Sequence, residues 1–302
     1  MQALKVDHYF TIGTSHARSG EPCQDYALSG TLKDARIYAI VTDGCSGASA
    51  RTDLGARVLA LAMEAELQRT TSLNDCFTPA SIHRIRTHLQ SMPLGGTPQD
   101  YLASIVAFCS TSTTAKIFMA GDGAYATHHA NGTVHITEAS WPDNAPYYLG
   151  YCLQPAVAAR FANQTEAKQR PPPTSVRPEM VEGPAGFDQL SPNGVTLTTH
   201  TTGIEATTQV IPTHDFLQGW TTEIDLTDIT ALAICTDGIG QISALDTLEA
   251  ATACLAFKNY EGSFVKRRTM KALAQWEKNG HIPQDDFSIA ALARVQPKEA
   301  AS

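Results

Sequence analysis

Short apolar runs separated by polar or glycine-containing breaks fill much of the first half of the chain. Between Tyr9 and Val41 they are FTIG, DYALSG and RIYAIVT, and ASIVAFCS at 103–110 and AKIFMA at 115–120 follow. Runs of this length are typical of β-strands. Asn131-Gly132 separates two alternating runs, which favours a tight hairpin. Near the C-terminus, TALAICTDG and FSIAALARV predict two further buried strands.

Helical spacing marks the segments between these runs. Over residues 52–67, apolar side chains recur along one helix face at Leu54, Val58, Leu61 and Ala65. A second helix is expected over 78–90, where the missing N–H of Pro79 costs nothing in the first turn. Another follows Ser243, and a last one spans 263–278 and stops at Asn279-Gly280. The inner face of that last helix consists of Val265, Thr269, Ala272 and Trp276.

This alternation of elements bears on the domain organisation. Strands dominate the first half and helices come in pairs, which predicts a layered α+β domain with packed sheets and helices on the outer faces. A chain of 302 residues suits one large domain, and we expect a single domain over 1–302. Prolines and glycines crowd the segment 163–194, which we interpret as a mobile insertion or a flap over the site.

Composition and charge exclude several classes of function. The chain is 43% hydrophobic and 17% charged, as globular proteins are. The net charge is −8 and the basic residues are scattered, so we expect no nucleic-acid partner. No apolar run reaches bilayer length and the first residues do not resemble a signal peptide, which predicts a cytoplasmic protein without a membrane partner. The seven irregularly placed cysteines predict reduced thiols.

Aspartates stand at the ends of several predicted strands. Asp43, Asp122 and Asp237 each precede a glycine at the end of an apolar run, and Asp285-Asp286 opens the last run. One Asp-Gly pair after a strand is usually only a turn. Several carboxylates gathered at strand ends repel one another unless a cation neutralises them. The repetition therefore predicts a binuclear centre for small divalent cations with oxygen ligands.

The order of these motifs resembles that of the type 2C protein phosphatases. The motifs are GTSHARSGEPCQDYAL, IVTDGCSGA, GDG, CTDGI and DDFSIAAL, and RRTMKALAQWEKNGHIPQDD is similar to the family's C-terminal element. The form SHARSGEPCQD looks closest to a bacterial branch. The resemblance covers nearly the whole chain. It implies a four-layer α-β-β-α sandwich, with two antiparallel sheets flanked by helices and two Mn²⁺ or Mg²⁺ ions at one end of the sheets.

The resemblance also implies roles for individual residues. Asp43 corresponds to the carboxylate that bridges both ions, and the carbonyl of Gly44 corresponds to a backbone ligand. Asp237 and Asp285 match direct ligands of the other ion. Since Asp43 and Asp237 hold the ions that perform the chemistry, they are also candidate catalytic residues.

Three more aspartates have counterparts in that family. Asp25 matches a carboxylate that holds metal-bound water. Asp122 matches an acidic position that, together with the equivalent of Asp237, takes a weaker third ion in bacterial members. Asp286 stands where the family usually has Asn, so we expect it to lie outside the set of direct ligands.

The implied reaction needs no phosphoenzyme, because a water bridging two cations loses its proton near neutral pH and attacks phosphorus in line. Two positions depart from the family pattern. Cys45-Ser46 follow the first Asp-Gly, where many eukaryotic relatives carry a histidine, and Gly20 replaces the usual phosphate-binding arginine. His16 is the candidate for proton transfer. Arg18 is the candidate for binding phosphate through its fork of donors.

The sequence therefore predicts a metal-dependent phosphatase that hydrolyses phosphoserine or phosphothreonine in proteins, as the counterpart of a Ser/Thr kinase in bacterial signalling. Two alternatives stay open. One is a non-catalytic member of the same fold that binds a partner or phosphopeptide, because the usual arginine and histidine are missing. The other is a phosphatase for small phosphorylated metabolites, because the sequence has no obvious docking surface for a protein.

Overall fold

A computed structural model describes residues 3–49, 51–92, 95–141, 144–160 and 194–295. The segment 163–194, which we predicted to be an insertion or flap, lies outside these residues except for Gly194.

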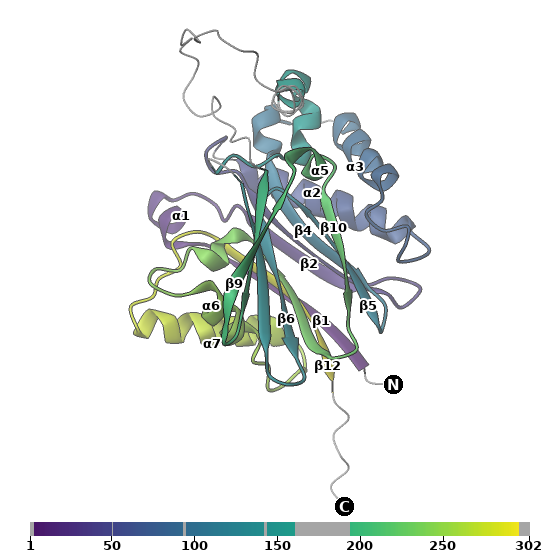
Figure 1. Cartoon of the computed structure of the whole chain (residues 1–302). Helices are drawn as coiled ribbons and strands as arrows, with labels where there is room; N and C mark the ends of the chain where they lie inside the picture. Colours follow the sequence, from purple (N-terminus) through teal and green to yellow (C-terminus); the bar gives the residue numbers. More distant parts are fainter. Residues whose placement is uncertain (1–2, 50, 93–94, 142–143, 161–193, 296–302) are drawn as a thin grey trace, which may run out of the picture.

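Two antiparallel sheets form the centre of the molecule (Figure 1). The seven-stranded sheet has the order β1 (Ala3–Thr11), β12 (Phe287–Val295), β11 (Ile229–Cys235), β6 (Gly123–His129), β7 (Val134–Ser140), β8 (Val195–Thr201) and β9 (Ile204–Ile211). The five-stranded sheet has the order β10 (Trp220–Asp225), β5 (Thr114–Ala120), β4 (Ala103–Ser110), β3 (Ile37–Gly44) and β2 (Asp25–Thr31). The first and last strands of the chain pair with each other, which places both ends of the sequence in one sheet.

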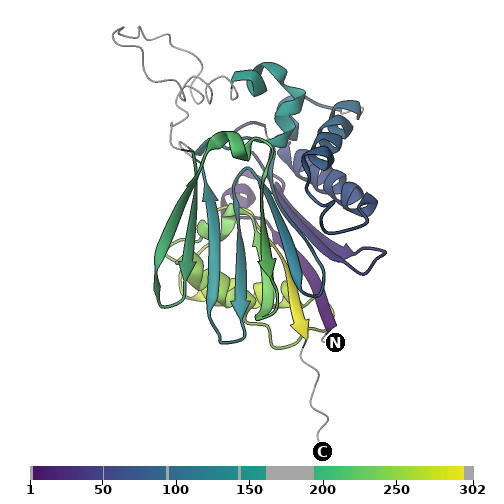
Figure 2. The same cartoon turned by 45° about the vertical axis from the view of Figure 1, so that its right-hand side comes forward.

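Helices cover the outer face of each sheet (Figures 1 and 2). Helices α2 (Thr52–Arg69) and α3 (Pro79–Ser91) pack on the five-stranded sheet, while α6 (Thr247–Leu255) and α7 (Phe264–Lys278) pack on the seven-stranded sheet. Short helical elements complete the layers: α1 (Thr14–Ser19), η1 (Pro98–Tyr101), η3 (Leu149–Leu153), α5 (Thr213–Phe216) and η4 (Asp237–Gly240). The predicted four-layer α-β-β-α sandwich is confirmed.

Strand β3 shows why its sequence is apolar at successive positions. Ala39 and Val41 face the space between the sheets, whereas Tyr38 and Ile40 face α2 and α3. Because both faces of this strand are buried, the alternation expected of a half-exposed strand disappears. Asp43 is the penultimate residue of this strand, so its carboxylate is held at the end of an element that is buried on both faces.

Several elements agree with the sequence-based expectation. The first long helix begins at Thr52, Pro79 opens α3, and β6 and β7 form the hairpin around Asn131-Gly132. Three strands, β8, β9 and β10, were not predicted, and they are rich in threonine and poor in continuous apolar runs. Helix α1 was also missed, because its six residues are too few to display a helical period.

Candidate metal centre

The predicted aspartates meet at one end of the sandwich. Asp25 opens β2 and lies opposite Asp43, the penultimate residue of β3. Asp122 lies in the turn between β5 and β6, Asp237 follows β11, and Asp285 precedes β12. Because the strands are antiparallel, the end of one and the start of its neighbour share an edge. Both sheets therefore contribute carboxylates to one cluster, which we call the carboxylate floor.

Like charges dominate the electrostatics of this floor. Burial, then repulsion from Asp25 and Asp237, raises the pKa of Asp43 well above its usual range. Burial likewise raises the pKa values of Asp25 and Asp237. For Asp122, burial and the charge of Asp237 raise the pKa from 3.8 to about 7. The carboxyl groups thus hold protons unless a cation offsets their mutual repulsion.

Two side chains orient these carboxylates. The hydroxyl of Thr236 donates to Oδ2 of Asp25 at 2.7 Å, and Nε2 of Gln241 donates to Oδ2 of Asp237 at 2.7 Å. Oδ1 of Asp25 is buried and, apart from the neighbouring carboxyl groups, has no donor among the described residues. A buried carboxylate oxygen without a donor, inside a cluster of oxygen ligands, fits a hard divalent cation such as Mg²⁺ or Mn²⁺.

The glycines of two Asp-Gly pairs are explained by close packing, not by a turn. Neither Gly44 nor Gly238 has a positive φ. A Cβ on Gly44 would lie 2.6 Å from the backbone oxygen of Thr52, and one on Gly238 would lie 1.9 Å from that of Asp286. Both contacts are too short for any other residue, so glycine lets the backbone approach closely beside each aspartate.

Asp286 holds the N-terminal segment against the floor. Its carboxylate, 2% exposed, accepts hydrogen bonds from the backbone N–H of Gly13 at 2.7 Å and of Gln24 at 2.5 Å. Nδ1 of His16 lies 3.0 Å from the same carboxylate. An ionised carboxylate accepts from several donors at once, whereas Asn has a single acceptor oxygen. This arrangement gives a physical reason for an acid at a position where Asn is usual in the family it resembles.

Helix α1 carries the candidates for proton transfer and phosphate binding. His16 is buried, and suitable ligand atoms of His16, Asp285 and Asp286 all lie within 4.8 Å of one another. Its Nε2 is 3.6 Å from a carboxylate oxygen of Glu21. Arg18 is exposed on the same helix and makes no hydrogen bond or ion pair with the residues described.

Sequence reasoning missed several residues that support the floor. The backbone oxygen of Gln24 accepts from the N–H of Gly44, and its Oε1 accepts from Thr52 at 2.9 Å. Tyr148 is buried close enough to Asp122 for that charge to help raise the pKa of its phenol. Gln24 and Thr236 each directly precede a predicted aspartate in the sequence, and this adjacency is the signal that could have identified them. Tyr148 has no such signal, since it reaches the floor only through tertiary packing.

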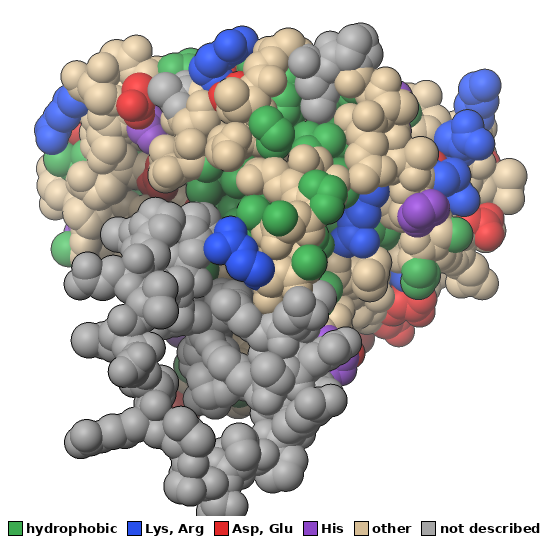
Figure 3. Space-filling model, turned by 90° about the horizontal axis from the view of Figure 1, so that it is seen from above, with side chains coloured by type: hydrophobic (Ala, Val, Ile, Leu, Met, Phe, Trp, Pro, Cys, Tyr) green, Lys and Arg blue, Asp and Glu red, His purple; other side chains and the backbone are tan. Residues whose placement is uncertain are grey.

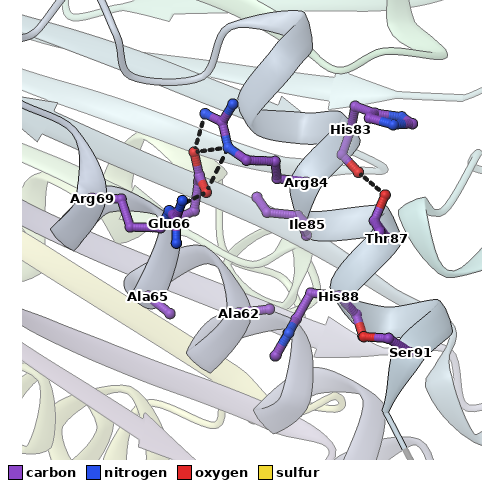
Figure 4. Close-up of a pocket in the computed structure, with 10 residues that line it drawn as sticks. All are labelled: Ala62, Ala65, Glu66, Arg69, His83, Arg84, Ile85, Thr87, His88 and Ser91. Atoms are coloured by element: carbon purple, nitrogen blue, oxygen red, sulfur yellow. Dashed lines mark hydrogen bonds and ion pairs between the residues drawn. The ribbon is translucent and has the colours of Figure 1, made fainter.

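The other charged region of interest is a groove between α2 and α3 (Figure 4). It holds about 620 Å³ and contains none of the aspartates of the floor. Figure 3 shows the molecule from above. On the described part of the face seen there, Lys and Arg side chains are scattered and form no single basic patch. None of the described helices is both long and apolar enough to cross a membrane.

Comparison with known proteins supplies independent information. The sequence profile of the protein phosphatase 2C family matches residues 12–276. No curated protein sequence gave a significant match. Among solved structures, a bacterial serine phosphatase has a TM-score of 0.55 at 10% identity and covers 98% of this chain and 100% of its own. Two others are similarly distant in sequence.

The serine/threonine phosphatase Stp1 from Staphylococcus aureus has a TM-score of 0.53 at 9% identity, with 98% of this chain and 96% of that chain covered. The catalytic domain of the serine/threonine protein phosphatase PstP, solved with two manganese ions, has a TM-score of 0.51 at 12% identity, with 98% and 100% covered. At these identities the likeness concerns the fold.

Proposed function

Since the chain belongs to the protein phosphatase 2C family, whose members are metal-dependent serine/threonine protein phosphatases, we propose that the carboxylate floor is its catalytic centre and takes two Mn²⁺ or Mg²⁺ ions. The observation that carries this proposal is the charge balance of the floor. Its carboxylates repel one another, and the electrostatic neighbours that raise the pKa of Asp43 are all other aspartates. A bound divalent cation would offset this repulsion, and the oxygen ligands of the floor suit such an ion.

The proposed ligand set follows from position in the fold. Asp43 is central, because its carboxyl is within hydrogen-bonding reach of those of both Asp25 and Asp237 when one of them holds a proton. We assign Asp43, the Gly44 carbonyl, Asp237 and Asp285 as ligands and Asp25 as the carboxylate that holds water beside the ions. Asp122, whose pKa responds to the charge of Asp237, is the proposed ligand of a weaker third ion.

When bound, the ions supply an acidified water as nucleophile and offset charge on the phosphoryl oxygens. The chain's own residues do the positioning. Thr236 fixes the orientation of Asp25, and Gln241 fixes that of Asp237. Asp286 ties Gly13 and Gln24 to the residue that precedes β12.

His16 and Arg18 stay predictions for the remaining two tasks. His16 lies between the carboxylates of Asp286 and Glu21, and we propose it as the proton donor to the departing alkoxide. The exposed guanidinium of Arg18, on the same short helix, supports a role in binding the phosphate of the substrate.

We also propose that the whole chain is one domain that acts in the cytoplasm on phosphoproteins, opposite a Ser/Thr kinase. Seven free cysteines support a reducing compartment, since disulfides form and persist in oxidising ones. Ligands that come from β2 through to β12 support a single domain.

Hydrolysis of a phosphothreonine peptide with Mn²⁺, with Mg²⁺ and with chelator tests the proposal. Asp43→Asn and Asp237→Asn should each lower metal-dependent turnover by about a thousandfold, because the ions supply several kcal/mol of transition-state stabilisation. The matched control is Asp225→Asn. Asp225 also ends a strand, but its carboxylate accepts from the N–H of Thr227 at 2.8 Å and lies outside the floor.

Each outcome separates the rival functions. Turnover of sugar phosphates that exceeds turnover of the peptide would establish the metabolite phosphatase instead. Tight Mn²⁺ binding with no turnover of either substrate would establish a non-catalytic binding module.

A further inference from the structure

The groove between α2 and α3 is lined by both apolar and charged side chains (Figure 4). Ala62 and Ala65 of α2 and Ile85 of α3 are its apolar lining residues. Leu61 lies one turn before Ala65 and is 51% exposed, which makes it one of the few large apolar side chains on the described surface. Small side chains on α2 leave space between the helices that no described residue fills.

Arginines on both helices reach the same buried acid. Glu66 is 6% exposed and accepts from Nε of Arg84 at 2.9 Å, while Nε of Arg69 lies 3.9 Å from its other oxygen. Nη1 of Arg84 and the guanidinium nitrogens of Arg69 make no hydrogen bond with a described residue. The side chains of Arg84 and Arg69 remain 47% and 72% exposed. Their unused donors therefore face solvent at the groove.

The groove is cationic on an acidic protein. Two guanidinium groups face one carboxylate, and the exposed imidazoles of His83 and His88 complete the wall. The chain as a whole has a net charge of −8. A second hollow of about 610 Å³ shares Glu66, Arg69 and Arg84 with the groove. It also contains Asp75, whose carboxylate accepts hydrogen bonds from Thr71 and Ser72. An extended acidic chain that passes from one hollow to the other would cross both arginines.

The helical layer connects this groove to the carboxylate floor. Helix α2 starts at Thr52, whose backbone packs against Gly44, and it reaches Glu66 after about 20 Å at 1.5 Å per residue. At the end of α3, Gln90 donates to the backbone oxygen of Cys152, close to Tyr148. Glu66 thus lies about 20 Å along α2 from the residue that packs against Gly44, a length that about six extended residues span.

We propose that this groove is a docking site for an acidic segment of the phosphoprotein substrate, placed about six or more residues from the phosphorylated side chain. The identification of the bound protein as a substrate rests on the proposed function, whereas binding of an acidic segment needs only the groove. Arg69 and Arg84 bind the carboxylates, and Ala62, Ala65 and Ile85 accept an intervening apolar residue. This site supplies the protein-docking surface that the sequence did not reveal.

Direct binding tests the groove without catalysis. A fluorescent, unphosphorylated peptide rich in Asp and Glu is titrated with the full chain in chelator at two salt concentrations. Arg69→Glu should weaken binding by at least about tenfold, and salt should weaken binding to the native chain. The matched control is Lys271→Glu, which makes the same charge change at an exposed position of α7 on the opposite helical layer. Equal binding by Arg69→Glu and Lys271→Glu would overturn the proposal.

Kinetics then test the link to the floor. Phosphothreonine peptides carry the acidic run either next to the phosphorylated residue or about eight residues away, on either side. For the distant arrangement, Arg69→Glu should raise KM at least about fivefold and leave kcat unchanged, and peptides without an acidic run should not respond. A response that is the same for all peptides would overturn docking while leaving the phosphatase assignment intact. Failure of all hydrolysis would instead count against the proposed function, because the binding experiment does not depend on it.

Discussion

Glu66 in the α2–α3 groove and Asp25 on the carboxylate floor are both buried acids, yet their surroundings are opposite. Glu66 is 6% exposed and has two arginines beside it. Asp25 is 1% exposed. It accepts a hydrogen bond from the hydroxyl of Thr236, and its other neighbours are carboxyl groups of the same charge. Where the chain supplies its own countercharge, the acid is part of the structure. Where it supplies none, the countercharge has to be a ligand.

The largest effect that sharpens this contrast is stabilisation by metal. Mn²⁺ at a hundredfold excess over its Kd should raise the free energy of unfolding by about 2.7 kcal/mol, because the folded state alone presents the floor. Urea unfolding with and without metal measures it. Asp237→Asn should largely lose the response, whereas Glu66→Gln should keep it. A metal response in Asp237→Asn equal to that of the native chain would show that the ions bind elsewhere.

A smaller effect comes from removing the countercharge in the groove. Arg84→Ala should lower the free energy of unfolding, because it leaves the buried Glu66 with only the distant Arg69. Urea unfolding in chelator measures this change without any contribution from metal. The control is Arg57→Ala. Nε of Arg57 lies 3.9 Å from a carboxylate oxygen of Asp53, and both residues belong to α2. Loss of this surface pair should cost less than about 1 kcal/mol. An equal loss in both variants would contradict the structural role of the Glu66 pair.

Taken per pH unit, the smallest effect is a pH dependence with a defined sign. The pKa of Asp122 is raised from 3.8 to about 7 in the folded state, so the folded chain binds a proton that the unfolded chain has lost. Stability without metal should therefore fall as pH rises from about 4 to about 7, with a slope of at most about 1.4 kcal/mol per pH unit for this group. Subtracting the curve of Asp122→Asn isolates the contribution of Asp122 from that of histidines, which titrate in an overlapping pH range.

Saturating Mn²⁺ should flatten that difference, because a bound cation holds the carboxylates ionised. A difference curve that rises with pH would contradict the assigned direction.

The contrast also explains which parts of the centre were visible in the sequence. Asp43 and Asp237 were predictable because each follows a buried apolar run, so the local pattern fixes both the strand and its end. The reason for their glycines was not predictable. Gly44 and Gly238 look like turn residues, but they are required because Thr52 and Asp286 approach them from other elements.

The groove illustrates a different limit. The helical period of α2 identifies the residues that face inward, but it does not show that Arg84 of another helix will meet Glu66. Strands β8 to β10 were missed for a related reason, since their threonine-rich sequences are specified by pairing with neighbours more than by burial. The position of Tyr148 beside the floor likewise depends on packing between segments distant in the chain.

By itself, the sequence determined the periodic elements, the aspartates at strand ends and the family resemblance, because each depends on residues close together along the chain. Only the tertiary structure decided which charges meet. It joined carboxylates from two sheets into one floor, and it placed two arginines beside Glu66. The physical reason is that charge balance is a property of groups brought together in space, and folding brings together residues whose separation in sequence carries no signal of their contact.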